Sequence, residues 1–525
     1  MIYVLTTQEM RDADAAAGAI VGREALMRGA GERVAEMVRA LVPGGGRIVA
    51  FAGPGDNGGD AFAALASLDA SYERVLYADA APKPSAARAA AEKRASEAGI
   101  VVRPLPERDD EARACTADAA LAIDALFGTG SRLPLGERYH AAARALDARR
   151  LAVLAVDIPS GIDADTGTVG EVAVRATQTL ALAALKPGLL LMPARENVGA
   201  LWRAQIGIDD ATLAAHAHSF AALDDAAFLQ IVPKRAFESD KRRAGAPLVI
   251  AGSRQFPGAA VLCALGAARA GAGYVTVAAP ASAAAALRAH LVEQVVVEFD
   301  DEGPPERVVE SLCEIALRSS AIAIGPGLGL DDRIGTIVRE TIARTDLPIV
   351  ADASALFHLG KHLDPLREKR IVLTPHAGEF ARLSGKGTVK DAERVARLRE
   401  FVERTGITTL LKGLATLVYD GTTIFINTTG TNALATAGTG DVLTGVIGTL
   451  LSQGLSPFDA ARAGAYWHGW AGWCASRDRL VGVIARDVVQ NLGEAVPEAR
   501  YVFPRPMQEV FLQPMRRVFS NVGEF

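Results

Sequence analysis

Short apolar runs that end in polar, glycine-rich loops recur along the chain, and a helical segment follows most of them. One such unit runs from the apolar stretch 47–53 through the loop 54–61 into an alanine-rich helical segment. Strands separated by helices usually pair in parallel, because a parallel pair needs a long crossover connection. The pattern therefore predicts an α/β fold, with largely parallel sheets covered by helices on both faces.

This strand pattern occurs twice, which indicates two domains in a chain of 525 residues. The stretch 205–235 has mixed polarity and no clear strand, so we place the boundary near 215–225. We expect a first domain over 1–218, a second over 225–500, and a C-terminal extension over 501–525.

Helices are predicted at 7–18 and 24–41, before the first strand of the first half. The second half is expected to hold strands, some running into a loop, within 246–253, 274–280, 292–299, 321–329, 347–356, 370–380, 407–413 and 415–427. The last segment should fold back as a hairpin at Asp420-Gly421.

Charge and composition exclude several classes of partner. The net charge of −5 and the pI near 6.0 give no reason to expect binding to nucleic acid or an anionic membrane. No run of about 18 uninterrupted apolar residues occurs, and the N-terminal segment lacks the apolar core of a signal peptide. The four cysteines are far apart, which is typical of reduced thiols. We therefore expect a cytoplasmic protein.

The stretch NALATAGTGD at 432–441 is followed by apolar residues at helical spacing. We expect Gly438, Thr439 and Gly440 to form a tight loop and Asp441 to begin a helix. The free N–H groups of such a turn suit a phosphate or a developing anion. Asp441 is either a favourable charge at the helix start or a catalytic base, and the glycines favour the base.

Polar groups also follow three strands of the first half. Asp124 and Asp157 each end a strand, Ser160 comes shortly after, and the loop 54–61 contributes Asn57. One such group alone would be a loop cap, but three units together favour a ligand site, because the carboxyl ends of parallel strands share one edge. The oxygens of Asn57, Asp124 and Ser160 suit a hard alkali or alkaline-earth cation.

The first half resembles the NAD(P)H-hydrate epimerase family across roughly residues 1–210. The resemblance rests on MRDADAAA, LMRGAG, AGPGDNGGDAF, DALFGTG and VDIPSGIDADTG, which occur in family order. It implies a Rossmann-like three-layer αβα domain that interconverts the R and S epimers of hydrated NADH and NADPH, with potassium held by Asn57, Asp124 and Ser160. It assigns the proton transfer to carboxylates, for which Asp157 and Asp60 are the candidates. The implied contacts to the hydrated cofactor are Asp56, Asn57, Gly58, Gly59, Asp60, Gly128, Thr129, Gly130, Ser131, Arg132, Leu133, Pro134 and Asp157.

Further functional groups follow strands of the second half. Gly325, Gly327 and Gly329 allow a ligand to approach the backbone closely. His376 and Lys412 each end an apolar strand. A lone histidine is more often structural and a lone lysine is more often solvated, but the strand-end position of His376 favours a functional role.

Together with 432–441, these loops resemble the ADP/ATP-dependent NAD(P)H-hydrate dehydratase family, whose fold is ribokinase-like. FPGAA, AARAGAGYVTVA, IGPGLG, LTPHAGEF, LLKG and LATAGTGDVLTGVIG occur in family order over roughly 230–497. The resemblance implies that the hydrated cofactor contacts Ala259, Gly327, His376 and Asp441. It implies that ADP, assisted by magnesium, lies along Lys412, Gly413, Leu414, Ala415, Thr416, Gly438, Thr439 and Gly440.

The expected function is therefore repair of hydrated NADH and NADPH (NADHX and NADPHX). Epimerisation comes first, and ADP-dependent dehydration of the S epimer then yields NAD(P)H, AMP and phosphate. Asp441 would deprotonate the C6 hydroxyl, which attacks the terminal phosphate of ADP. The alternative is a small-alcohol (vitamin precursor) kinase fused to a non-catalytic ligand-binding module. We expect small molecules as the only ligands, and a homo-oligomer.

Overall fold

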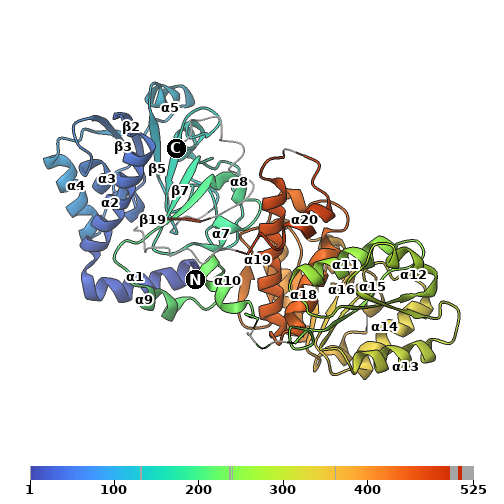
Figure 1. Cartoon of the computed structure of the whole chain (residues 1–525). Coiled ribbons are helices and arrows are strands. Elements are labelled where there is room, and N and C mark those ends of the chain that lie inside the picture. Colours follow the sequence, from blue (N-terminus) through green and yellow to red (C-terminus); the bar gives the residue numbers. More distant parts are fainter. Residues whose placement is uncertain are drawn as a thin grey trace. The chain divides into compact units, whose positions relative to one another are not determined.

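The computed structural model describes residues 2–130, 133–235, 238, 240–360, 362–479, 481–496 and the backbone of 507–510. Contacts divide the chain into two compact units, one containing Ile2–Ala222 and the other Leu223–Arg500 (Figure 1). In the described part of the chain, no helix has the length and apolar character needed to span a bilayer.

The first unit is built on an 8-stranded sheet. In spatial order its strands are β4 (Val102–Pro104), β3 (Tyr72–Ala78), β2 (Gly46–Ala52), β5 (Leu121–Ala125), β6 (Val153–Val156), β7 (Gln178–Leu182), β8 (Ala200–Ala204) and β19 (Met507–Val510). All neighbours are parallel except β19, which adds an antiparallel edge from the C-terminal extension. Separately, β1 (Ile2–Val4) and β9 (Phe220–Ala222) form an antiparallel pair.

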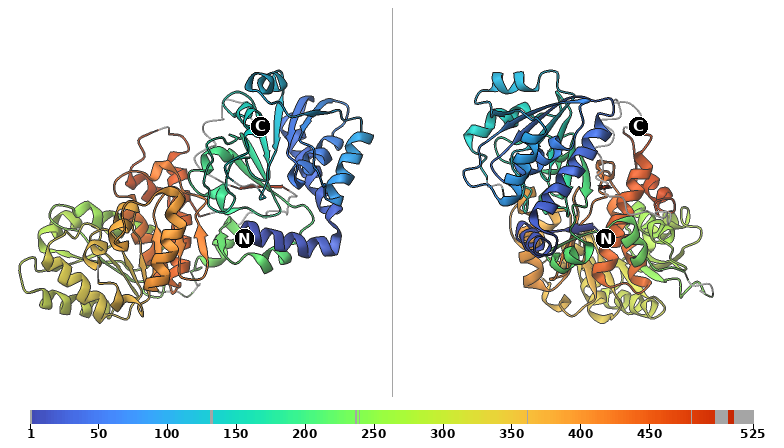
Figure 2. Two further views of the ribbon diagram at one scale, coloured as in Figure 1. Left: turned by 180° about the vertical axis from the view of Figure 1, so that it is seen from behind. Right: turned by 90° about the vertical axis from the view of Figure 1, so that its left-hand side faces the viewer.

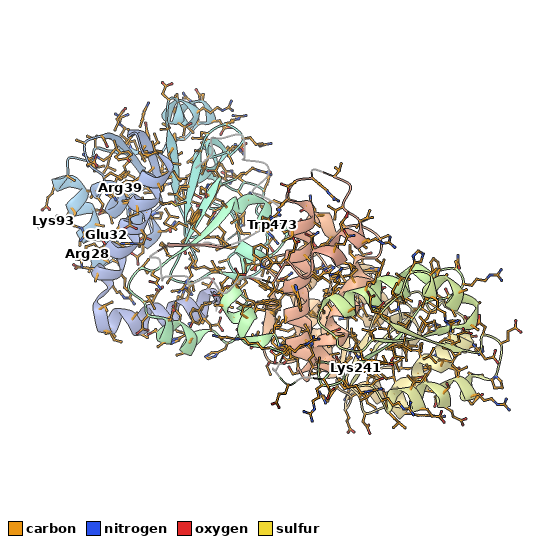
Figure 3. All side chains as sticks on the ribbon, in the orientation of Figure 1. Arg28, Glu32, Arg39, Lys93, Lys241 and Trp473 are labelled. Carbon is orange, nitrogen blue, oxygen red and sulfur yellow. The ribbon has the colours of Figure 1, made fainter. Side chains whose placement is uncertain are left out.

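Helices cover both faces of this sheet. They are α1 (Thr7–Val21), α2 (Arg23–Leu41), α3 (Asp56–Ala66), α4 (Ala86–Glu97), α5 (Asp109–Thr116), η1 (Glu137–Tyr139), α6 (His140–Ala145), α7 (Pro187–Leu190), α8 (Arg195–Val198) and α9 (Asp210–His216). Alternate residues of a strand face opposite sides, so Ile48 packs with α2, α3 and α4, whereas Phe51 packs with η1 and α6. Charged residues such as Arg28 and Lys93 lie on the outer side of the helical layer (Figure 3).

The second unit repeats this architecture. Its strand order is β18 (Ile424–Ile426), β17 (Leu417–Tyr419), β16 (Thr408–Leu411), β15 (Ile371–Leu373), β14 (Ile349–Ala351), β13 (Ala321–Ile324), β10 (Pro247–Ile250), β11 (Thr276–Pro280) and β12 (Val295–Phe299). The strands from β12 to β16 are parallel, and β16, β17 and β18 are antiparallel. The predicted strands and the hairpin are confirmed.

Helices again lie on both sides of the sheet (Figure 2). They are α10 (Asp225–Ile231), α11 (Pro257–Arg269), α12 (Ala281–Arg288), α13 (Pro305–Ala316), α14 (Asp332–Arg344), α15 (Ser354–Leu359), η2 (Asp364–Leu366), α16 (Ala377–Ser384), η3 (Asp391–Glu393), α17 (Arg394–Thr405), η4 (Asn432–Leu434), α18 (Thr439–Ser452), α19 (Pro457–Ser476) and α20 (Ala485–Asn491). The helix α18 packs unusually closely on α11, because a methyl group on Gly266 would lie 2.6 Å from the Val442 carbonyl oxygen.

Candidate active sites

Asp352 is the centre of the polar cluster in the second unit. It directly follows β14 and is only 2% exposed. Its Oδ1 accepts a hydrogen bond of 2.7 Å from Lys412 Nζ, and its Oδ2 accepts one of 2.8 Å from Thr444 Oγ1. Lys412 follows β16 and Thr444 lies in α18, so Asp352 joins three elements at the carboxyl edge of the sheet.

Asp441 lies in the first turn of α18 and is half-buried. The prediction that the helix begins at Asp441 is wrong by two residues, because α18 already starts at Thr439. The Thr439 hydroxyl donates to the Leu434 carbonyl oxygen at 2.8 Å, which closes the preceding turn. Only Gly438, with φ +90°, adopts the left-handed conformation that a tight turn needs.

The charges around Asp441 suit a general base. Burial raises the pKa of Asp441 to about 7, and the Asp352 carboxylate contributes to this rise while Lys412 opposes it. Burial disfavours the charged form of Lys412, but Asp352 and Glu379 outweigh that effect and raise its pKa. Lys412 Nζ lies 3.7 Å from Glu379 Oε2. A carboxyl group with a pKa near neutrality can both accept and release a proton.

The two segments predicted to hold ADP meet at this cluster. A methyl group on Gly440 would lie 3.5 Å from Lys412 Nζ. The segment from Lys412 to Thr416 forms a closed turn through Leu414 and Ala415, in which the Thr416 hydroxyl donates to the Gly413 carbonyl oxygen at 2.8 Å. The structure thus brings the predicted segments together.

Two residues predicted to contact the hydrated cofactor are also neighbours. Gly327 follows β13 with φ +67°, and Ala259 lies in the first turn of α11. A methyl group on Gly327 would lie 2.9 Å from Ala259 Cβ and 2.8 Å from the Phe256 carbonyl oxygen. Gly327 is therefore required for this close approach.

His376 has a structural role at the start of α16. Its Nδ1 accepts from the N–H groups of Gly378 (3.0 Å) and Glu379 (3.3 Å), which caps α16. Glu379 Oε2 accepts the His376 N–H at 2.8 Å and completes the capping box. The His376 side chain is 60% exposed, so its predicted contact with the hydrated cofactor stays a prediction.

In the first unit, the prediction of a loop over 54–61 is wrong from Asp56 onward. The helix α3 begins at Asp56, so Asp56–Asp60 are helical. Gly58 and Gly59 serve close packing instead of loop conformation. A methyl group on Gly58 would overlap the Gly53 carbonyl oxygen, and one on Gly59 would lie 2.7 Å from the Met27 side chain.

The predicted cation ligands converge at the carboxyl edge of β5 and β6. Ser160 Oγ donates to Asp124 Oδ1 at 2.7 Å, and the Ser160 N–H donates to Asp124 Oδ2 at the same distance. Burial raises the pKa of Asp124 to about 6, against the effect of these hydrogen bonds. Among the described residues, Asn57 Nδ2 is buried without a hydrogen-bond partner. The oxygens of Asn57, Asp124 and Ser160, not the Asn57 nitrogen, are the hard ligands that suit a potassium ion.

Asp157 and the loop after β5 meet next to these ligands. A methyl group on Gly128 would lie 3.3 Å from Asp157 Oδ2 and 3.1 Å from Asn57 Oδ1. Asp60 is buried, and burial followed by the charges of Asp157 and Asp56 raises its pKa well above the usual range. The structure therefore groups these predicted residues.

The rest of the predicted loop is described only in part. Thr129, Gly130, Leu133 and Pro134 continue from Gly128. Ser131 and Arg132 lie outside the described residues.

The sequence analysis missed several polar residues at both sites. Lys186 lies within an otherwise apolar run of the sequence, and in the structure it forms a buried ion pair with Asp157. Arg88 donates to the carbonyl oxygens of Gly53 and Gly55, each at 2.6 Å, and holds the turn before α3. In the second unit, Asp352, Glu379 and Thr444 were also missed. Their pairing depends on tertiary contacts, although the strand-end position of Asp352 was a usable signal.

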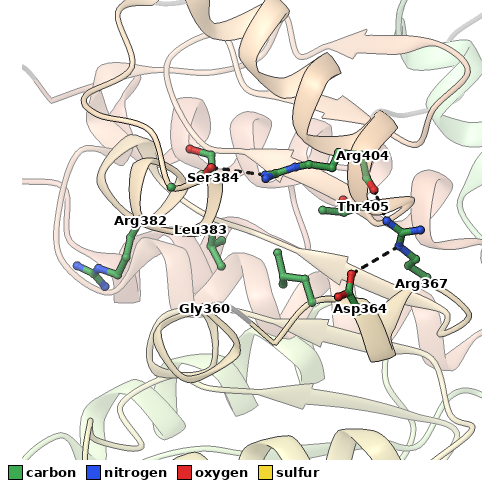
Figure 4. A pocket seen from close by; sticks show the side chains of 10 residues that line it. Gly360, Asp364, Arg367, Arg382, Leu383, Ser384, Arg404 and Thr405 are labelled. Carbon is green, nitrogen blue, oxygen red and sulfur yellow. Dashed lines mark hydrogen bonds and ion pairs between the residues drawn. The ribbon is translucent and has the colours of Figure 1, made fainter.

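A separate cavity of about 310 Å³ lies in the second unit between the ends of α15, α16 and α17 (Figure 4). Arg367 donates to the Arg404 carbonyl oxygen at 2.6 Å, and Arg404 donates to the Ser384 carbonyl oxygen at 3.5 Å. These guanidinium groups therefore satisfy carbonyl groups near helix C-termini. None of the predicted site residues lines this cavity.

The two folds and their sites define a two-domain α/β enzyme, with a Rossmann-like first unit and a ribokinase-like second unit. The family model described as NAD(P)H-hydrate dehydratase matches residues 247–493, and the one described as YjeF-related protein N-terminus matches 23–188.

Relatives match nearly the whole chain. The bifunctional NAD(P)H-hydrate repair enzyme Nnr of Pyrobaculum aerophilum is 35% identical, over 95% of this chain and 99% of its own length. The enzyme of the same name from Mycobacterium tuberculosis is 36% identical, over 79% of this chain and 81% of its own. The chain therefore belongs to the family of bifunctional NAD(P)H-hydrate repair enzymes, and the alternative of a kinase fused to a non-catalytic module is not favoured.

One of the similar solved structures is the ADP/ATP-dependent NAD(P)H-hydrate dehydratase from Bacillus subtilis, co-crystallized with ATP/Mg²⁺. It is 30% identical, covers 52% of this chain and 96% of its own, and has a TM-score of 0.47.

Proposed function

We propose that this chain repairs hydrated NADH and NADPH in two steps. The first unit interconverts the R and S epimers, and the second removes water from the S epimer at the expense of ADP, which yields AMP and phosphate. The observation that carries the second step is Asp441, a half-buried carboxyl group with a pKa of about 7 at the start of α18 and close to Lys412. Family membership supports both steps.

In the dehydration step, Asp441 takes the proton of the C6 hydroxyl, and the hydroxyl oxygen attacks the terminal phosphorus of ADP. The bond from that phosphorus to the bridging oxygen breaks, and AMP leaves with the electron pair. The free N–H groups at Gly438–Gly440 and the ammonium of Lys412 stabilise the negative charge of the transferring group. Loss of phosphate from C6 and of a proton from C5 then restores the double bond of NAD(P)H.

Magnesium fits this site as a companion of the nucleotide. The described residues contain no group of three or more His, Cys, Asp or Glu side chains arranged to hold a metal ion. Mg²⁺ is usually bound by one or two carboxylates together with phosphate oxygens and water. Mg²⁺ would be held mainly by phosphate oxygens and water, because both oxygens of Asp352 already accept hydrogen bonds and Asp441 is assigned to the proton transfer. Bound Mg²⁺ would neutralise charge on the phosphates.

For the first unit, we propose that the hydrated cofactor binds along Asp56–Asp60, Gly128–Pro134 and Asp157. Potassium would be held by Asn57, Asp124 and Ser160, and would supply positive charge at the edge of the sheet. The convergence of Gly128, Asn57 and Asp157 supports this arrangement.

A single assay tests both activities. Mixed NADHX epimers are incubated with the protein and either ADP or ATP, and NADH absorbance and phosphate release are followed. Complete conversion to NADH supports both steps and shows which nucleotide is preferred. Consumption of only the S epimer would show an inactive first unit. A stable phosphorylated product without NADH would exclude dehydration.

We also infer a cytoplasmic location and a homo-oligomeric assembly. All four cysteines are free, as is usual in a reducing compartment. Light scattering of the purified chain tests the assembly, and a monomer across a wide range of concentrations would contradict it.

A further inference from the structure

Lys186 forms a buried ion pair at the carboxyl edge of the first sheet. Its Nζ donates to Asp157 Oδ1 and, at 3.1 Å, to the Leu182 carbonyl oxygen. Only 1% of the Lys186 side chain and 10% of the Asp157 side chain are exposed. Removing two charges from water costs free energy that an apolar pair would avoid. Fold stability alone therefore gives no reason for a lysine at this position.

The ion pair fixes how the Asp157 carboxylate is oriented. Asp157 Oδ1 also accepts the Leu182 N–H at 3.1 Å, so two donors hold this oxygen. The Asp157 backbone has φ +68°, which a residue other than glycine rarely adopts. A conformation of this kind persists only where surrounding contacts enforce it. The Lys186 and Leu182 contacts, together with the Asp157 N–H bond to the Leu180 carbonyl oxygen at 2.8 Å, are such contacts.

The other oxygen of Asp157 is directed toward the proposed substrate loop. A methyl group on Gly128 would lie 3.3 Å from Asp157 Oδ2. No hydrogen bond to Oδ2 occurs among the described residues. One oxygen is thus anchored while its partner remains available to a ligand.

We propose that Lys186 is the positioning residue of the epimerisation site, which holds Asp157 so that Oδ2 faces the C6 hydroxyl of the hydrated cofactor. This inference rests on the proposed epimerase function. Asp157 Oδ2 takes the hydroxyl proton, a C6=O bond forms, and the C6–N1 bond breaks with its electron pair moving to N1. Asp157 then delivers the same proton to N1. After rotation about the C5–C6 bond, the reverse steps close the ring on the opposite face of C6.

A single anchored carboxylate is sufficient for this sequence, because the hydroxyl oxygen and N1 are both bonded to C6. Neighbouring charges support the arrangement. Burial raises the pKa of Asp14 to about 6. The charge of Lys186 opposes this rise, and the charge of Asp157 adds to it. The charge of Asp157 also raises the pKa of Asp60, and the charge of Lys186 lowers it. Lys186 therefore sits among several carboxyl groups and pairs with only one of them.

The test compares Lys186→Met with the exposed control Lys93→Met on α4, in the full-length protein. Epimerisation is measured from the conversion of the R epimer with ADP present, and dehydration from the S epimer serves as the internal reference. We expect Lys186→Met to lower the epimerisation kcat by ~10²-fold, the scale of general-base loss, with little change in KM. Dehydration by both variants and epimerisation by Lys93→Met should match the wild type.

Two further measurements separate positioning from folding. The double variant Lys186→Met/Asp157→Asn should have the same epimerisation kcat as Asp157→Asn alone, since Lys186 acts through Asp157. Methylamine should increase epimerisation by Lys186→Ala, because it can replace the missing ammonium. The inference would be overturned if the two substitutions lowered the epimerisation kcat additively. It would also be overturned if Lys186→Met changed only KM or kept the wild-type kcat. A wild-type chain that leaves the R epimer unconverted would instead refute the proposed epimerase, and this inference with it.

Discussion

Thr444 Oγ1 donates a 2.8 Å hydrogen bond to Asp352 Oδ2, and this contact ties α18 to the end of β14. Lys412 occupies the other Asp352 oxygen at 2.7 Å. Because both oxygens of Asp352 are engaged, Asp441 is the carboxylate that remains free for proton transfer. The two acidic residues therefore have separate tasks, one holding the site together and the other acting on the substrate.

Asp441→Asn should lower the dehydration kcat by ~10²-fold or more, because an amide cannot accept the C6 hydroxyl proton. Epimerisation in the same chain should be unchanged. The two rates are measured with purified S and R epimers of NADHX. Dehydration at the wild-type rate would mean that Asp441 only stabilises the N-terminus of α18.

Dehydration should depend on pH through Asp441. The base works as a carboxylate and its pKa is about 7, so kcat/KM should rise as the pH increases through 7 and fall below it. A pH profile of kcat/KM checks this. A profile that is flat from about one pH unit below to about one unit above the Asp441 pKa of about 7 would contradict its role as the base.

Asp352→Asn should shift this profile to lower pH. The substitution removes the negative charge that raises the pKa of Asp441 and leaves Lys412, which lowers it. Both changes favour the ionised base at lower pH. The shift is measured as the midpoint of the acidic limb, and a shift to higher pH would show that another group controls the profile.

Lys412→Met should destabilise the second unit by about 3 kcal/mol or more, because it leaves Asp352 buried without its charged partner. Denaturant unfolding measures the loss. Combining it with Asp352→Asn should recover much of the stability, since no uncompensated charge then remains. If the double variant is less stable than Lys412→Met, the ion pair is not the cause.

Gly440→Ala should weaken ADP binding without unfolding the helix. Alanine is compatible with a helical position, but its methyl group would lie 3.5 Å from Lys412 Nζ, where the phosphates are proposed to bind. Gly387→Ala is the matched control, because a methyl group there meets nothing within 4 Å. Calorimetric titration with ADP compares the two, and equal affinities would place the phosphates elsewhere.

The strands and the edge that holds the sites were predictable, because apolar runs that end in glycine and acidic residues directly reflect parallel sheets. The first residue of α3 and of α18 was not, since a helix with glycine in its first turn resembles a loop in sequence. Gly58 and Gly59 are needed for close packing that only the folded chain reveals. The Lys412–Asp352 and Lys186–Asp157 pairs join residues 60 and 29 positions apart. No local pattern indicates which charged residues will meet over such separations.

The contact between α11 and α18 limits how the second site can vary. Backbone meets backbone at Gly266 and Val442, so no flexible side chain lies between the two helices to absorb a change. A side chain added at Gly266 would push the start of α18 away and so displace the Gly438–Asp441 turn. Where side chains face one another in a core, a substitution can be absorbed by repacking. At the contact between α11 and α18, a substitution instead alters how Asp441 is aligned with the nucleotide. Variants at Gly266 should therefore lose catalysis before they lose their fold.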